Sequence, residues 1–154
     1  MTSNHITDIS EKKKKPWLLW YGASVSFFIL DRFLKYLALS QVSFVPNKFI
    51  AFILFKNKGI AFSIPFASVV FWPIALFIFG FLIIFFLRSL RREPLHATFL
   101  FCILLGALSN LFDKFFYDAI VDYVIFFGRS AVNIADGMII IGLVPFLFVT
   151  KGKV

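Results

Sequence analysis

The stretch FASVVFWPIALFIFGFLIIFFL, residues 66–87, has 22 residues and no charged side chain. About 20 apolar residues are needed for a helix to cross the hydrocarbon core of a bilayer. This stretch therefore predicts a transmembrane helix, and neighbouring helices can accommodate the proline within it, Pro73. Arg88, Arg91 and Arg92 follow directly, and cationic residues beside a span favour the cytoplasmic side of the membrane.

The rest of the chain has the same apolar character. Its 154 residues are 60% hydrophobic, whereas ordinary globular chains are about 45–50% apolar. One soluble core cannot hide this excess, so we expect a single membrane domain over residues 16–150. Residues 1–15 are polar and end in four lysines, which predicts a disordered cytoplasmic tail. The net charge of +8 comes largely from Lys and Arg that flank apolar runs, which indicates membrane topology and no nucleic-acid partner.

Three further spans are predicted on either side of the first stretch. Charges at Asp31, Arg32 and Lys35 interrupt the apolar run near the N-terminus, which favours an uncleaved helix over a signal peptide. Four spans place both ends of the chain on one side. Nine Lys and Arg fall on that side and seven on the other, so we expect cytoplasmic termini. The predicted spans are about 17–39, 66–87, 95–112 and 132–150.

Residues 42–64 are too apolar for a solvated loop and too interrupted for a span. Two β-prone runs, 49–55 and 60–64, flank the sequence Lys56-Asn57-Lys58-Gly59. Asn and Gly tolerate positive φ, so this pattern predicts a β-hairpin with its turn at 56–59. We expect the hairpin to form a small sheet on the outer surface of the membrane.

Four acids lie within residues 111–137, LFDKFFYDAIVDYVIFFGRSAVNIADG. An Asp at the centre of a membrane helix costs roughly 2.5–3.5 kcal/mol, so acids in such segments are candidates for function. Asp118 is expected to be a solvated loop residue. Helical spacing groups the remaining polar residues on two helix faces: Gly106, Asn110, Asp113 and Lys114 on one helix, and Asn133 and Asp136 on the next.

Asp122 and Asp136 are the favoured catalytic candidates because a loop separates them, so they can face each other from different elements. Two close carboxyl groups cannot both ionise. The ionised group can activate a water, and the protonated group can polarise a scissile carbonyl. Asp113 can instead pair locally with Lys114.

Structural and non-catalytic interpretations remain open at this point. In one alternative, Asp31 serves only as an ion-pair partner of Arg32 or Lys35 at the membrane interface. Carboxylate and Asn oxygens also suit Mg²⁺ or Ca²⁺, although the absence of His and Cys from this part of the sequence argues against zinc. The acids can also serve as a proton or ion pathway in a small membrane protein.

Several short blocks, taken in order, resemble those of bacterial lipoprotein signal peptidase (signal peptidase II), a membrane aspartic protease. The similarity runs from about residue 31 to 142. The blocks are DRFLKY from Asp31, NKGIAFS from Asn57, GALSNLFDK from Gly106, IVDY with Asp122, and NIADG with Asp136.

The resemblance implies an all-α membrane protein with four transmembrane helices and a small extracytoplasmic β-cradle between the first and second helices. It implies cleavage of a prolipoprotein just before its diacylglyceryl-modified Cys, by Asp122 and Asp136, with no metal or cofactor. The expected partners are the lipidated prolipoprotein and membrane lipid, and we expect a monomer in the bacterial inner membrane with its site toward the outer face. The residues expected to bind substrate or support the site are Asp31, Asn57, Gly59, Asn110, Asp113, Lys114 and Asn133.

The chain departs from the family pattern at four positions. Ser109 replaces a Gly, Lys114 an Arg, Tyr123 a Phe and Gly137 a Ser. Lys keeps the charge of Arg but loses its planar bidentate geometry. The changes at Ser109, Lys114 and Gly137 leave open a homologue that binds lipidated peptides without cleaving them.

Overall fold

The computed structural model describes residues 17–59 and 68–150, which form four helices and three short strands. The predicted tail at 1–15 and the predicted strand at 60–64 lie outside the described residues. The elements in chain order are α1 (Trp17–Leu39), β1 (Ile50–Asn57), α2 (Ser68–Arg92), α3 (Pro94–Tyr117), β2 (Ile120–Phe126), β3 (Ser130–Val132) and α4 (Ile134–Thr150).

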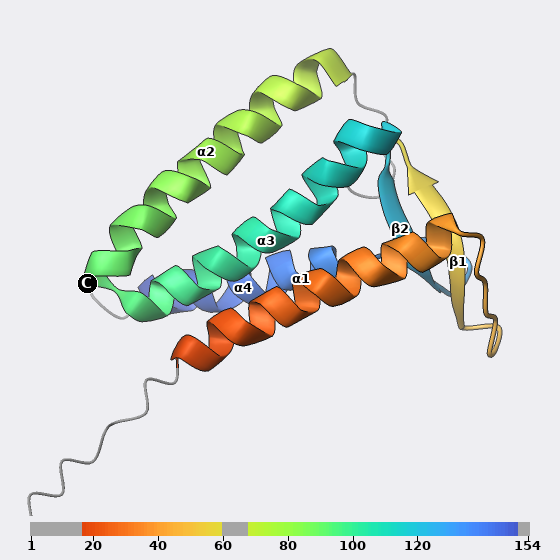
Figure 1. Ribbon diagram of the computed structural model, residues 1–154, viewed down its shortest axis with the longest axis horizontal. Coiled ribbons are helices and arrows are strands. Elements are labelled where there is room, and N and C mark those ends of the chain that lie inside the picture. The colour runs from red at the N-terminus through yellow and green to blue at the C-terminus, as the bar shows by residue number, and fades with distance from the viewer. Residues whose placement is uncertain (1–16, 60–67, 151–154) are drawn as a thin grey trace, which may run out of the picture.

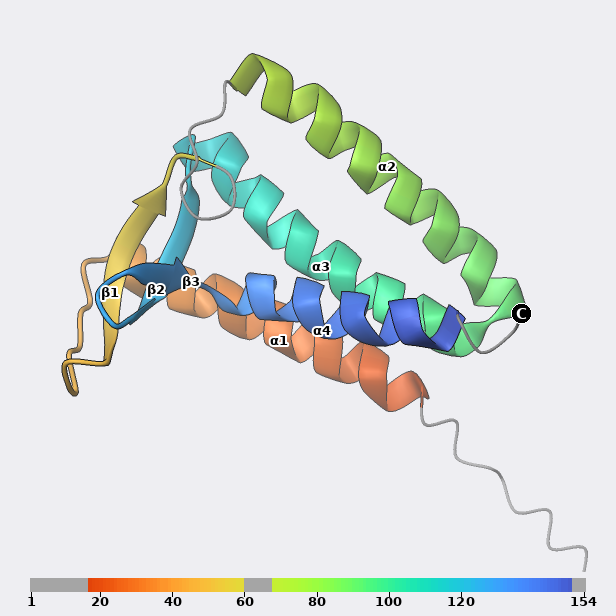
Figure 2. The same cartoon turned by 180° about the vertical axis from the view of Figure 1, so that it is seen from behind.

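The helices α1, α3 and α4 lie side by side, with the sheet at one end of the group (Figures 1 and 2). The helix α2 packs mainly on α3 and lies outside this group. Trp72 of α2 meets Phe115 of α3 edge to face, with 6.1 Å between ring centroids. The Arg-rich end of α2 lies at the end of the molecule away from the sheet.

All four helices expose large apolar side chains, and α1 and α3 also bury several polar and charged ones. The buried residues of α1 are Ser24, Asp31, Lys35 and Ala38, whereas many of its large apolar side chains are exposed. Within the described ranges, two helices are long and apolar enough to cross a membrane, Val69–Arg92 and Pro94–Tyr117, and Ile134–Phe148 is a shorter apolar helix. An inverted distribution of this kind fits lipid as the solvent of the outer surface, since apolar side chains facing water would be unfavourable.

The sheet differs from the predicted hairpin. β1 pairs antiparallel with β2, and β2 pairs antiparallel with β3, so two of the three strands come from the connection between α3 and α4. Lys56 and Asn57 belong to β1, so the predicted turn at 56–59 is wrong at these two positions. The placement of the sheet wholly between the first and second helices is therefore also wrong. Local β propensity located β1 but could not identify a partner strand more than 60 residues away.

The helices α3 and α4 approach each other closely at two glycines. A Cβ added at Gly106 would lie 2.6 Å from the carbonyl oxygen of Ala135, and one added at Gly142 would lie 2.7 Å from the carbonyl oxygen of Phe99. Small residues at membrane-helix contacts allow such approach. The contact at Gly106 also fixes the start of α4, where Asp136 lies.

We predict that Gly106→Ala lowers the stability of the protein by about 1–3 kcal/mol, because the new methyl group meets backbone that cannot move freely. Gly80→Ala is the matched control, since a Cβ at Gly80 meets nothing within 4 Å. Thermal unfolding in detergent should show a lower midpoint for Gly106→Ala and an unchanged or higher midpoint for Gly80→Ala. Equal midpoints for the two variants would contradict the close contact.

Candidate functional site

Asp122 lies within β2 and is almost completely buried, with 2% of its surface exposed. Its Oδ1 accepts a hydrogen bond of 2.6 Å from the side-chain amide of Asn133, and its Oδ2 accepts a longer one of 3.5 Å from the side-chain amide of Asn57. Asn57 comes into reach because β1 pairs with β2, with Asn57 opposite Ile120. Alternate residues of a strand face the same side, so Asp122 shares that side of β2 with Ile120.

The orientation of Asn57 is fixed from the segment that follows it. The backbone N–H of Gly59 donates to Oδ1 of Asn57 at 3.1 Å, which turns the amide nitrogen toward Asp122. Lys114 is buried, and its Nζ donates to the carbonyl oxygens of Lys58 at 2.8 Å and Asp118 at 3.1 Å. Lys114 therefore ties the end of β1 to the end of α3.

Asp136 lies in the first turn of α4, where it forms a reciprocal cap with Asn133. The N–H of Asp136 donates to Oδ1 of Asn133 at 2.9 Å, and the N–H of Asn133 donates to Oδ2 of Asp136 at 3.3 Å. This is the capping-box arrangement, which satisfies two otherwise free donors at a helix start. Oδ1 of Asp136 accepts a further hydrogen bond of 2.8 Å from the side-chain amide of Asn110.

Asp122 and Asp136 line the same cavity, which has a volume of about 520 Å³ and is also lined by Asn57. Asn133 contacts both carboxyl groups, by its side-chain amide to Asp122 and by its backbone N–H to Asp136. Burial and, after it, the negative charge of Asp136 raise the pKa of Asp122 to about 7, against the opposing effect of the amides of Asn133 and Asn57. A carboxyl group that is partly protonated at neutral pH beside a second carboxyl group can perform general acid–base chemistry on one water.

The raised pKa of Asp122 predicts a pH dependence of stability. Between the ordinary carboxyl pKa of 3.8 and about 7, the folded protein binds more protons at this site than the unfolded chain does. Stability should therefore fall as the pH rises through that window. Asp122→Asn cannot lose a proton, so it should flatten the fall of the thermal unfolding midpoint between pH 5 and pH 8. A fall of the same size in the variant would contradict the assigned pKa.

A cluster of ion pairs lies buried between α1 and α3. Nζ of Lys35 is 3.0 Å from Oδ2 of Asp31 and 2.7 Å from Oδ2 of Asp113, and all three side chains are fully buried. Arg32 adds a second cation at 2.5 Å from Oδ1 of Asp113. The predicted ion pair of Asp31 is confirmed with Lys35, and both side chains are buried inside the protein. The predicted pairing of Asp113 with Lys114 is wrong, because Asp113 pairs with Arg32 and Lys35 of α1.

This cluster joins the carboxyl pair through Asn110. Nζ of Lys35 donates to Oδ1 of Asn110 at 2.9 Å, and the amide nitrogen of Asn110 then points to Asp136. The same oxygen of Asn110 accepts from the side chain of Asn133 at 3.3 Å. A buried hydrogen-bonded group has few alternative orientations, so Lys35 sets the direction of the amide that Asp136 receives.

We predict that Lys35→Met destabilises the protein by about 3–5 kcal/mol, because the buried carboxylate of Asp31 loses its ion-pair partner while Asp113 keeps Arg32. Lys48→Met serves as the control, since Lys48 is exposed and its Nζ lies over the ring of Phe49. Urea or thermal unfolding of both variants in detergent would compare them. The account would be contradicted if the two substitutions had equal effects.

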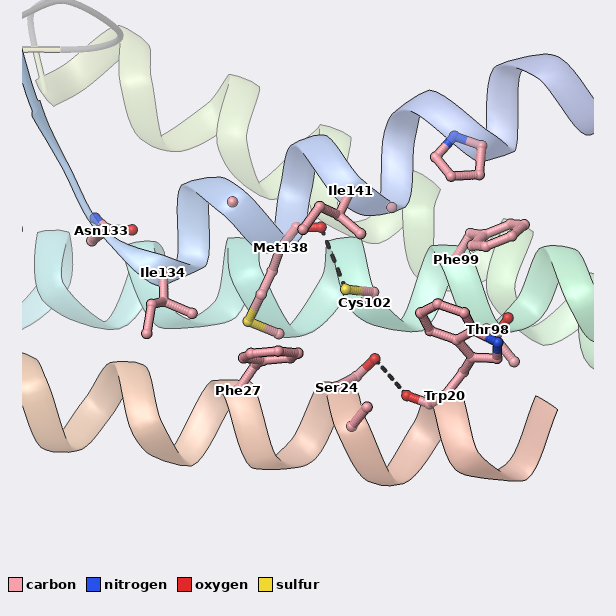
Figure 3. Close-up of a pocket in the computed structure, with 14 residues that line it drawn as sticks. Trp20, Ser24, Phe27, Thr98, Phe99, Cys102, Asn133, Ile134, Met138 and Ile141 are labelled. Carbon is pink, nitrogen blue, oxygen red and sulfur yellow. Dashed lines mark hydrogen bonds between the residues drawn. The ribbon is translucent and has the colours of Figure 1, made fainter. Parts of the chain in front are cut away.

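A second cavity, of about 370 Å³, lies between α1, α3 and α4 (Figure 3). Its polar groups are already bonded: Ser24 donates to the carbonyl of Trp20, and Cys102 to that of Met138. Met138 and Ile141 line this cavity, whereas Asp136 and Ile140 of α4 line the cavity with the carboxyl pair. At 3.6 residues per turn these are opposite faces of α4, so the two cavities lie on opposite sides of this helix, and Asn133 of the candidate site also lines the second cavity.

Each of the seven residues expected to bind substrate or support the site has contacts that the structure describes. Asn57, Asn110 and Asn133 hold the two carboxyl groups directly, and Gly59 and Lys114 hold the segment around Asn57. Asp31 and Asp113 belong to the buried ion cluster.

Sequence reasoning gave Lys35 no role at the site and named Tyr123 and Ser109 only as departures from the family pattern. The spacing of Asp31 and Lys35, four residues apart on one helix, was the signal for Lys35. The hydroxyl groups of Ser109 and Tyr123 gave no such signal, because their partners lie on other elements. Within residues 17–59 and 68–150, no three His, Cys, Asp or Glu side chains converge in a way that could hold a metal ion.

The fold has matches among solved structures. Two solved structures, both titled as a bacterial membrane enzyme determined by the in meso method, match it with TM-scores of 0.71 and 0.70 and 24% sequence identity, each covering 90% of this chain. They cover 92% and 93% of their own chains. Residues 23–151 match the family described as signal peptidase (SPase) II, and the chain belongs to this family.

Curated relatives agree with the family match. The lipoprotein signal peptidase of Coxiella burnetii (strain Dugway 5J108-111) is 30% identical over 94% of this chain and 98% of its own length. Those of Syntrophomonas wolfei and Acinetobacter baylyi are 32% and 33% identical, over 87% and 86% of this chain and 95% and 82% of their own lengths. The prediction of a membrane protease of the signal peptidase II type is thus confirmed.

Proposed function

We propose that the chain removes the signal peptide from diacylglyceryl-modified prolipoproteins, and that Asp122 and Asp136 are its catalytic pair. The observation that supports the assignment most strongly is the position of Asn133, which donates to both carboxyl groups beside one cavity. The other two acids of the segment have different environments. Asp113 is ion-paired to α1, and the side chain of Asp118 is 76% exposed.

The environments of the two carboxyl groups suggest different roles. Asp136 accepts two N–H donors at the start of a helix, a position that favours a negative charge. Asp136 would then act as the general base. Asp122, with a pKa of about 7, would carry the proton that the pair shares.

In the proposed reaction, Asp136 takes a proton from water while the water oxygen bonds to the scissile carbonyl carbon. Asp122 gives its proton to the carbonyl oxygen, so that a tetrahedral diol forms. When the diol collapses, the C–N bond breaks and the amine nitrogen of the lipidated Cys receives the proton that Asp136 holds. The second hydroxyl returns its proton to Asp122, which restores the starting state and leaves a carboxyl group on the signal peptide.

The proposed membrane placement follows from the same site. α1 to α4 would all cross the bilayer within a single domain, with both termini in the cytoplasm and the arginines at the end of α2 on that side. The sheet and the carboxyl pair would then lie at the outer face of the bacterial inner membrane. A signal peptide is itself an apolar helix, so it could enter from the bilayer while its scissile bond meets water at the interface. A monomer would suffice, because both acids come from one chain.

The proposal predicts that Asp122→Asn and Asp136→Asn each reduce cleavage by at least about a thousandfold, the scale on which paired catalytic groups act. The measurement is a gel-shift assay with purified protein and a lipidated prolipoprotein. Asp118→Asn is the matched control, and it should cleave at the rate of the wild type.

Normal processing by either pair variant would overturn the catalytic assignment. A wild-type protein that binds the lipidated substrate in a pull-down but yields no product after long incubation would instead identify a binding homologue.

A further inference from the structure

Asp31 of α1 is the point where three other elements meet. Its Oδ2 accepts a hydrogen bond of 2.6 Å from the hydroxyl of Ser109 on α3, and its Oδ1 accepts one of 2.9 Å from the hydroxyl of Tyr123 on β2. Oδ1 also accepts from the backbone N–H of Ala135 on α4 at 3.1 Å. One buried carboxylate therefore connects α1 with α3, β2 and α4.

Tyr123 extends this connection to the first residue of α4. Its hydroxyl donates to Asp31 and accepts a hydrogen bond of 2.9 Å from the backbone N–H of Ile134. The side chain is fully buried. Burial and the nearby charge of Asp31 raise the pKa of Tyr123, so the hydroxyl keeps its proton and remains a donor.

These contacts complete the start of α4. The first four N–H groups of a helix have no partner within the helix. In α4 they donate in turn to the Tyr123 hydroxyl, Asp31, the side chain of Asn133 and, at 3.5 Å, the carbonyl of Asn133. Two of the four acceptors thus belong to α1 and β2, so the first turn of α4 cannot shift without breaking bonds to those elements.

The residues that carry these two hydroxyl groups are each adjacent in sequence to a residue of the candidate site. Tyr123 follows Asp122, and Ser109 precedes Asn110, which donates to Asp136. The Ser109 hydroxyl also lies 3.2 Å from Nζ of Lys35. A displacement of Tyr123 would therefore move the adjacent residue Asp122. A displacement of Ser109 would move the adjacent residue Asn110 and its hydrogen bond to Asp136.

We propose that Tyr123 and Ser109 are positioning residues whose hydroxyl groups, joined through Asp31, fix the start of α4 against β2 and so set the placement of Asp136 relative to Asp122. This inference rests on the proposed function, because it assigns the two hydroxyls to the same carboxyl pair. Both residues are departures from the family pattern of Phe and Gly. Their place in the fold makes them part of the support of the site.

The experiment compares Tyr123→Phe, Ser109→Ala and the double variant in the lipidated prolipoprotein assay. Each single variant should lower kcat roughly tenfold while KM stays unchanged, because neither hydroxyl lines the cavity. The double variant should lose less than the product of the single losses, since both hydroxyls act through Asp31. Tyr36→Phe and Ser26→Ala, which alter exposed residues of α1, should cleave as the wild type does.

A second measurement does not depend on activity. Hydrogen exchange of the peptide that covers the start of α4 should become faster in Tyr123→Phe, because the N–H of Ile134 loses its acceptor. Exchange in α2 should stay unchanged. A global loss of stability would instead accelerate exchange throughout the protein.

Unchanged kcat in Tyr123→Phe, or unchanged exchange at the start of α4, would overturn the inference. A rise in KM with kcat unchanged would also overturn it, because that result would mark a binding role. If the wild-type protein does not cleave but exchange at α4 still responds to Tyr123→Phe, the proposed function fails and the structural link between β2 and α4 stands.

Discussion

The buried ammonium group of Lys35 is the interaction on which the rest of the structure depends. It lies between the carboxylates of Asp31 and Asp113, which come from α1 and α3. Arg32 supplies the second cation of this cluster, which therefore contains two cations and two carboxylates. In a bilayer, apolar side chains gain little by leaving lipid, and helices associate instead through close packing and polar contacts. This cluster therefore both joins the helices and orients Asn110 toward Asp136.

The site follows from this arrangement because each carboxyl group is held from a different direction. Asp122 is carried by a strand and Asp136 by the first turn of a helix, and Asn133 stands between them. The close approach of α3 and α4 at Gly106 places Asn110 against the start of α4. The relative position of the two carboxyl groups is therefore set jointly by α3, α4, β1 and β2.

The sequence allowed a prediction of what depends on local pattern. Charge-free runs predicted the helices, and helical spacing grouped Asn110 with Asp113 and Asn133 with Asp136. The ordered blocks predicted the family, which the comparison over residues 23–151 confirmed. The partner strand of β1 could not be predicted, because α2 and α3 separate β1 from β2 along the chain. The partner of Asp113 was also wrong, since adjacency to Lys114 carries less weight than packing against α1. The departure at Ser109 left open a homologue that does not cleave, and the departure at Tyr123 carried no structural prediction, whereas both hydroxyls bond to Asp31 in the interior.

The central claim is that Asp122 and Asp136 act as one pair that holds a single proton near neutral pH. Infrared difference spectroscopy of protein with ¹³C-labelled aspartate measures this directly, because a protonated carboxyl group has a carbonyl stretch that a carboxylate lacks. The account predicts a protonated carboxyl band in the wild type at pH 6 that fades as the pH rises past about 7. The band should be absent from Asp122→Asn. A wild-type spectrum with no such band at pH 6, or a band that persists unchanged in Asp122→Asn, would contradict it.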